Sequence, residues 1–191
     1  MEVAEQIITT NTSNIKVQKR DGRLEPLDID KIHFVVEEAC EGLTGVSSSQ
    51  IEINANIQFY DGITTKDIQH VLVKSANDLI SLENPNYQYA AARLLSYDVR
   101  KEAHGQYEYI PLLKLILRNI KLGVYDRTIV EKYHKSEIKK LNTWIKRDRD
   151  LDFTYAGLRQ VVDKYLVQDR STGELYELSL IHISEPTRQE A

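Results

Sequence analysis

Cysteine is nearly absent from this chain, and that alone removes several classes of site. The 191 residues include one cysteine, Cys40. A single cysteine cannot form an internal disulfide, a CxxC redox pair or a cysteine zinc cluster. Its place among helically spaced apolar residues predicts a small buried side chain in a protein from a reducing compartment.

Long apolar runs and an excess of one charge are also missing. No run approaches the roughly 18 apolar residues of a membrane span, and residues 1–14 lack the apolar segment of a signal peptide. Twenty-five basic against 29 acidic residues give a net charge of −4, whereas nucleic-acid binders usually carry a basic excess. We therefore expect a cytoplasmic protein without a nucleic-acid or membrane partner. Neither a P-loop nor a GxGxxG motif occurs, so any anion site depends on local arrangement.

The residues that are present predict a mainly α fold with small β-hairpins. Apolar side chains make up 41% and charged side chains 28% of the chain, as in soluble globular proteins. Helical spacing predicts four helices up to Gly105, with Asp28 or Asp30 as first cap and Asn84–Pro85 opening the fourth. Shorter helices are expected at 112–122, 128–132, 136–141 and 154–164, and a second hairpin at 165–168 and 174–177.

A first hairpin is the most informative local feature. Extended arms at 15–20 and 23–27 flank Asp21–Gly22, which predicts a type I′ turn with positive φ at both central residues. The hairpin brings Lys19, Arg20, Glu25 and Lys31 toward one small volume, which suits a nucleotide. Thr65, at a helix start, adds a hydroxyl beside free backbone amides. The alternative interpretation is a set of solvated surface charges.

Two acidic patterns suggest metal sites, and both are better explained otherwise. Asp148, Asp150 and Asp152 resemble the opening of a calcium loop, but the sixth and twelfth positions carry Phe153 and Arg159. A solvated turn is expected there. His33 and Glu37 share a helix face, which indicates a surface contact. We expect no metal site.

Four separated blocks resemble a known family in order and spacing. Residues 17–22, 30–32, 59–65 and 86–94 closely resemble the ATP-cone at the front of ribonucleotide reductase large subunits. Residues 105–108, 148–150 and 164–170 look like the start of the class I aerobic alpha subunit. The resemblance implies a flexible leader at 1–14 and a β-hairpin plus four-helix ATP-cone at 15–105. It also implies the first helical part of the reductase at 106–177, followed by a disordered, unrelated tail at 178–191.

The resemblance also implies an effector site. In this family the cone binds ATP as activator and dATP as inhibitor of ribonucleoside diphosphate reduction, and Mg²⁺ is expected with the nucleotide. Lys19, Arg20 and Lys101 would meet phosphates, and Glu25 and Asp28 the base or sugar. The implied contacts are Lys19, Arg20, Glu25, Pro26, Leu27, Asp28, Ile29, Asp30, Lys31, Thr65, Gln69 and Lys101.

Two of these positions depart from the family pattern. Asp28 stands where Asn is common, so an acceptor replaces a group that can also donate. Gln69 stands where His is common. Both differences bear on the distinction between ATP and dATP.

At full length such a reductase is a thioredoxin-dependent enzyme that works with a radical-generating beta subunit and a second alpha subunit. Its catalytic cysteines lie beyond residue 191, so we expect no catalytic residue here. Residues 178–191 resemble translated adapter sequence, which suggests a truncated gene fragment.

Three alternatives compete with this interpretation. A cone-bearing transcription regulator needs a cysteine zinc ribbon, which one cysteine excludes. The anaerobic reductase class is disfavoured by the match after Gly105. The third is a stand-alone module, either a nucleotide-binding cone or a helical interaction domain without a ligand.

Overall fold

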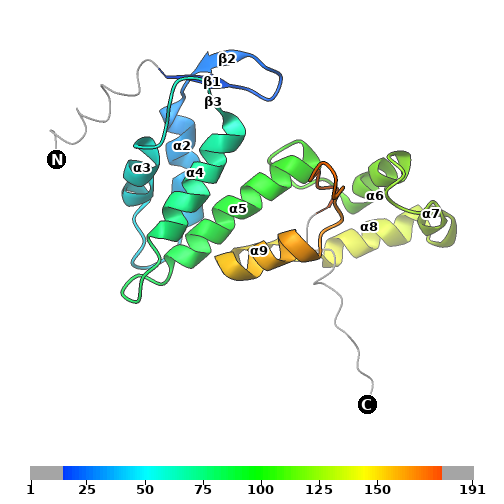
Figure 1. The fold of residues 1–191 in the computed structure, drawn as a ribbon. Helices are drawn as coiled ribbons and strands as arrows, with labels where there is room; N and C mark the ends of the chain where they lie inside the picture. Colours follow the sequence, from blue (N-terminus) through cyan, green and yellow to red (C-terminus); the bar gives the residue numbers. More distant parts are fainter. Residues whose placement is uncertain (1–14, 178–191) are drawn as a thin grey trace. The chain divides into compact units, whose positions relative to one another are not determined.

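The computed structural model describes residues 15–177, and within them the chain is mainly helical with one small sheet (Figure 1). The predicted fold class is confirmed. The described residues divide into two compact units, one of 15–95 with 153–156 and one of 96–152 with 157–177. The predicted leader at 1–14 and tail at 178–191 lie outside the described residues.

Three short strands form the sheet of the first unit. β1 (Lys16–Gln18) pairs antiparallel with β2 (Leu24–Pro26), with Val17 opposite Glu25. β3 (Ile63–Thr64) pairs parallel with β1 on its other side, so β1 is the central strand. The hairpin was predicted and β3 was not, because two residues are too few to show an alternating pattern.

The predicted type I′ turn is wrong. Gly22 has a φ of +85°, and no non-glycine residue among those described has a positive φ, so Asp21 does not. The Gly22 N–H donates to the Lys19 carbonyl at 2.9 Å, and the Lys19 N–H donates to the Arg23 carbonyl at 2.8 Å. This is a three-residue loop in which a type I turn is followed by a left-handed glycine bulge. It needs one glycine and avoids a strained aspartate.

Four helices complete the first unit: α2 (Ile29–Cys40), α3 (Ser48–Asn56), α4 (Thr65–Asp78) and α5 (Tyr87–His104), whose last turns belong to the second. Asp28, Ser47 and Thr64 cap the first three with their side chains. α5 begins at Tyr87 rather than at Pro85, whose carbonyl instead accepts the Gln88 N–H in a turn.

Buried aliphatic side chains from the four helices and from β1 and β3 fill the core of the first unit. Ile63 of β3 is fully buried, as is Leu94 of α5, and Val17 is the one buried residue of β1. Ala90 and Ala91 on α5 are also fully buried, and their small size lets neighbouring helices approach closely. The core therefore holds the sheet against the N-terminal ends of α2 and α4. Figure 1 shows the three strands beside these ends of the two helices.

The second unit contains α6 (Leu112–Lys121), α7 (Thr128–Lys132), α8 (Lys135–Trp144), a 3₁₀ helix η1 (Arg147–Asp152) and most of α9 (Tyr155–Lys164). Leu112, Ile116 and Ile138 form a core cluster between α6 and α8. The predicted second hairpin is reduced to one antiparallel bridge, Gln168 with Leu175. No helix within residues 15–177 is long and apolar enough to cross a bilayer.

The solvated turn predicted around Asp150 is wrong. Asp150 lies in η1 and is only 4% exposed, and the Tyr109 hydroxyl donates a hydrogen bond to it. Burial raises the pKa of Asp150 to about 6, although Arg100 and Arg147 lie nearby. Their guanidinium carbons lie 4.2 and 4.5 Å from the centre of the Tyr109 ring. The carboxylate is a structural group in a cation–aromatic cluster.

Candidate functional site

The hairpin and the start of α2 hold two neighbouring sets of ion pairs. Lys19 Nζ lies 3.2 Å from Glu25 Oε2, and Arg23 Nη1 lies 3.4 Å from the other carboxylate oxygen. Lys31 Nζ lies 2.8 Å from Asp28 Oδ2. The predicted gathering of Lys19, Glu25 and Lys31 is therefore present, and each lysine is paired with a carboxylate.

Asp28 links the hairpin to α2. Its side chain accepts the Lys31 backbone N–H at 3.2 Å, which makes it the N-cap of the helix. Hydrogen bonds from Lys31 lower the pKa of Asp28, and the charge of Lys19 adds to this effect. Asp28 in turn raises the pKa of Lys31, and Glu25 adds a smaller effect in the same direction. These four side chains thus form one electrostatically coupled cluster.

The third strand brings the start of α4 to the same sheet. Gln18 stands beside Thr64 in the parallel register, so the chain continues to Lys19 on one strand and to Thr65 on the other. Thr64 caps α4 by accepting the Asp67 N–H at 3.0 Å, and its hydroxyl donates to Asp67 Oδ2 at 2.7 Å. A helix N-terminus favours an anion, since its first N–H groups and its dipole are positive.

Gln69 lies one turn after Thr65 on α4, and its amide is engaged. Gln69 Nε2 donates to the Leu94 carbonyl of α5 at 2.8 Å. That bond ties the site-bearing helix to α5.

Most of the remaining predicted contact residues lie on or next to the hairpin and the start of α2. Pro26 ends β2, and the Leu27 N–H donates to the Ile15 carbonyl at 2.9 Å. Ile29 and Asp30 form the first turn of α2, and Arg20 lies exposed in the hairpin turn. Lys101 is different, because it lies in the last turns of α5 in the second unit.

Sequence reasoning missed two residues that shape the site. Arg23 pairs with Glu25 and also with Asp21, whose Oδ2 lies 2.7 Å from Arg23 Nε. The two-residue spacing of Asp21, Arg23 and Glu25 was a usable signal. Asp61 accepts the Lys16 N–H at 2.8 Å and so holds the start of β1. Its 45-residue separation from Lys16 left no local signal.

The charged groups and helix N-terminus of this site are of the kind that bind an anion. Phosphate recognition uses ammonium, guanidinium and backbone N–H donors. Here Lys19 and Lys31 carry ammonium groups, Arg23 carries a guanidinium, and the start of α4 presents backbone N–H groups. Cys40 is half-buried, and burial raises the pKa of its thiol to about 11, so the reactive thiolate is disfavoured at neutral pH.

Residues 15–102 match the family model described as the ATP cone domain. The chain carries an ATP cone. Over 164 residues, a stretch longer than the cone, the chain is 48% identical to the ribonucleoside-diphosphate reductase 1 subunit alpha of Escherichia coli K12, covering 86% of this chain. The alpha subunits of enterobacteria phage T4 and Helicobacter pylori are 42% and 37% identical over 85% and 84% of it. The predicted resemblance to class I reductase alpha subunits is thereby confirmed.

The chain is much shorter than these relatives. It covers 22% of the Escherichia coli and phage T4 subunits and 20% of the Helicobacter pylori subunit. The match runs through both structural units, so the second unit is also similar to a part of the reductase subunits.

Proposed function

We propose that the ATP cone of this chain binds ATP or dATP as an allosteric effector of ribonucleoside diphosphate reduction. The observation that carries the proposal is the coupled cluster of Lys19, Glu25, Asp28 and Lys31 beside the start of α4. The family match over residues 15–102 supports a nucleotide as the ligand.

Binding on this proposal is an exchange of partners. Lys19 and Lys31 leave their carboxylates for the triphosphate, and Glu25 and Asp28 then accept hydrogen bonds from ribose hydroxyls or the adenine amino group. Ion pairs between exposed side chains contribute only about 0–1 kcal/mol each, so breaking them costs little. Charge-assisted bonds to phosphate are stronger than neutral hydrogen bonds.

Other predicted contacts complete the proposed site. Thr65 presents the N-terminal N–H groups of α4 to a phosphate, and Arg20 and Lys101 supply further positive charge. A Mg²⁺ ion accompanies the nucleotide and is held chiefly by the phosphates. Gln69 holds α4 in place through its bond to the Leu94 carbonyl.

The chain by itself is proposed to regulate and not to catalyse. A radical reductase needs several cysteines, and this sequence has one, which lies in α2. In a protein of the relatives' length, the proposed partners are a radical-generating beta subunit and a second alpha subunit.

The proposal predicts that two lysines dominate nucleotide affinity. Lys19→Ala and Lys101→Ala are each expected to weaken MgATP binding by about 10- to 100-fold, since a charged hydrogen bond contributes about 1.5–3 kcal/mol. Isothermal titration calorimetry with MgATP and MgdATP measures this directly. Lys74→Ala is the matched control, because Lys74 is an exposed lysine of the same helix as Thr65 and pairs with Asp78 on α4.

The same titration separates nucleotide binding from a ligand-free interaction module. Saturating ATP at 100 times its dissociation constant is expected to stabilise the folded chain by about 2.7 kcal/mol. A folded wild-type chain with neither heat of binding nor thermal shift would favour the module. Equal loss in Lys19→Ala and Lys74→Ala would show that the charges act diffusely.

A further inference from the structure

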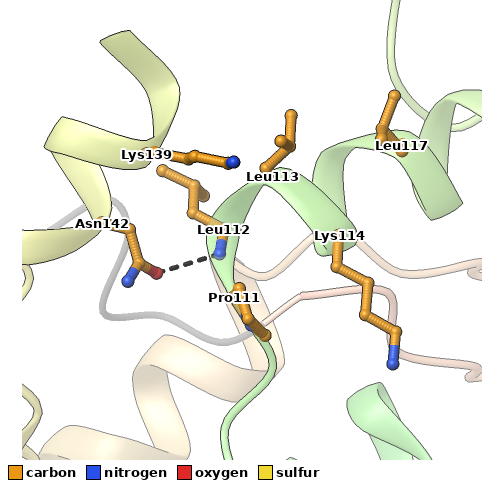
Figure 2. A pocket seen from close by; sticks show the side chains of 7 residues that line it. All are labelled: Pro111, Leu112, Leu113, Lys114, Leu117, Lys139 and Asn142. Atoms are coloured by element: carbon orange, nitrogen blue, oxygen red, sulfur yellow. Dashed lines mark hydrogen bonds between the residues drawn. The ribbon is translucent and has the colours of Figure 1, made fainter. Parts of the chain in front are cut away.

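The second unit carries an apolar groove that the cone does not explain. It lies between the start of α6 and α8, has a volume of about 500 Å³, and is lined mostly by Pro111 and the leucines at 112, 113 and 117. Leu117 is 43% exposed, so the floor of the groove faces solvent. Asn142 of α8 accepts the Leu112 N–H at 2.9 Å, which holds the two helices together at this point (Figure 2).

Two lysines border this apolar floor. Lys114 comes from α6 and Lys139 from α8, and Figure 2 shows them on different sides of the first turn of α6. Within residues 15–177 neither ammonium makes an ion pair or hydrogen bond. The lining contains no acidic residue. The groove thus combines an apolar floor with two separate, uncompensated positive charges.

We propose that this groove docks an acidic amphipathic peptide segment of a partner protein. Leu113 and Leu117 are one helical turn apart, which matches the spacing of apolar anchors on a docking helix. Carboxylates flanking those anchors would meet Lys114 and Lys139. Pro111 provides no side-chain cap to α6, and among the N–H groups of its first turn that of Leu112 donates to Asn142. The positive end of the helix dipole favours the same sign of ligand charge.

The placement of the two charges favours a peptide over a small anionic amphiphile. A fatty acid has one carboxylate and can neutralise one lysine, whereas the lysines here stand on different helices. A peptide with several Glu residues meets both while filling the floor with leucine side chains. The proposal is independent of nucleotide binding, since none of the groove residues is among the proposed nucleotide contacts.

A defined probe tests the groove in the whole chain. The probe is a fluorescein-labelled 14-residue helical peptide with Leu at positions i, i+3, i+4 and i+7 and Glu elsewhere, followed by fluorescence anisotropy. We expect saturable binding to the wild type and at least tenfold weaker binding to the double variant Lys114→Glu, Lys139→Glu. The matched control, Lys121→Glu with Lys135→Glu, makes the same charge change on the same helices outside the groove and should retain affinity within twofold.

Further measurements decide the remaining outcomes. Amide shifts in the wild type on adding the Glu peptide should cluster at 111–117 and 139–142, and this readout holds if a variant fails to fold. The same peptide with Lys in place of Glu should not bind. Absence of Glu-peptide binding, equal weakening in the control variant, or displacement by decanoate at equal affinity would each overturn the proposal.

Discussion

At the scale of single residues, Glu25 has an unusual position because it serves two cations at once. One carboxylate oxygen lies 3.2 Å from Lys19, and the other lies 3.4 Å from Arg23. If Lys19 turns to a phosphate, Glu25 keeps Arg23 as its partner. Arg23 therefore lowers the cost of moving Lys19, since Glu25 is not left without a counter-charge.

Substitutions of Asp28 separate the effect of its negative charge from the effect of its helix cap. Asp28→Asn keeps a good N-cap, so stability should change little. It also removes a negative charge near the proposed phosphates and frees Lys31 from its ion pair. We expect MgATP and MgdATP to bind about three- to fivefold more tightly, measured by calorimetry. Asp28→Ala, which loses the cap, is the comparison, and weaker binding to Asp28→Asn would contradict the exchange.

His33 gives the first unit a pH dependence. Its Nδ1 lies 2.8 Å from Glu52 and its Nε2 lies 3.1 Å from Glu37, so these carboxylates, with Asp30 nearby, raise the pKa of His33. The folded state then binds the proton more tightly than the unfolded chain does. This stabilisation is complete below the unfolded pKa of about 6.5 and is lost as the pH rises through the folded pKa.

The expected measurement is a pH series of urea unfolding. His33→Gln should be less stable than wild type by less than about 1 kcal/mol at pH 5.5, because the pairs are partly exposed. The difference should vanish by pH 8.5. Glu52→Gln should likewise make the free energy of unfolding depend less on pH. A stability difference between wild type and His33→Gln that widens as the pH rises would contradict the prediction.

At the scale of elements, the helices could be predicted well and the sheet only in part. Asp28 and Thr64 cap helices because short polar side chains precede apolar residues at helical spacing, which is a local signal. β3 could not be foreseen, since its evidence is the pairing of Ile63 with Val17. Asp150 was misjudged for the same reason, because its partner Tyr109 is 41 residues away.

Within the candidate site, too, the contacts with a local sequence signal could be predicted and the others could not. Lys19, Glu25 and Lys31 could be grouped from the hairpin pattern, and the structure pairs or couples them. Lys101 came only from the family resemblance, and its role stays a prediction. The hydrogen bond from Gln69 to the Leu94 carbonyl could not be predicted from the sequence, because it depends on how α4 packs against α5.

The hairpin turn gives a prediction at this scale. Gly22 has a φ of +85°, and a Cβ added there would meet nothing within 4 Å, so any cost is backbone strain. Gly22→Ala should destabilise the chain by about 1–2 kcal/mol, the usual cost of a left-handed non-glycine residue. Gly22→Asn, which tolerates this region better, should cost less in the same urea unfolding series. Equal costs for both variants would mean that the loop adopts another turn.

At the scale of the whole molecule, the two units are expected to respond differently to nucleotide. The proposed contacts of the first unit lie on the hairpin and at the starts of α2 and α4, whereas α6 and α8 pack around a separate core cluster. Saturating MgATP should slow amide hydrogen exchange within 16–31 and 63–69, because a ligand suppresses opening of the region that binds it.

Hydrogen exchange with mass spectrometry checks this prediction. Residues 112–121 serve as the internal control and should exchange at an unchanged rate. Protection spread evenly over the chain would indicate global stabilisation, and protection confined to 112–121 would place the nucleotide elsewhere. Lys19→Ala should remove the effect at the same ATP concentration.

The central position of β1 also bears on how the chain folds. Lys16 is held by Asp61 across 45 residues of sequence, so β1 joins β3 only after a long loop has closed. Loop closure of this kind is entropically costly and tends to come late in folding. We therefore expect the pairing of β1 with β3, beside Lys19 and Thr65, to form later than the local contacts of α2 and α3. An effector bound there would slow unfolding without speeding folding, so it would lengthen the lifetime of the folded chain.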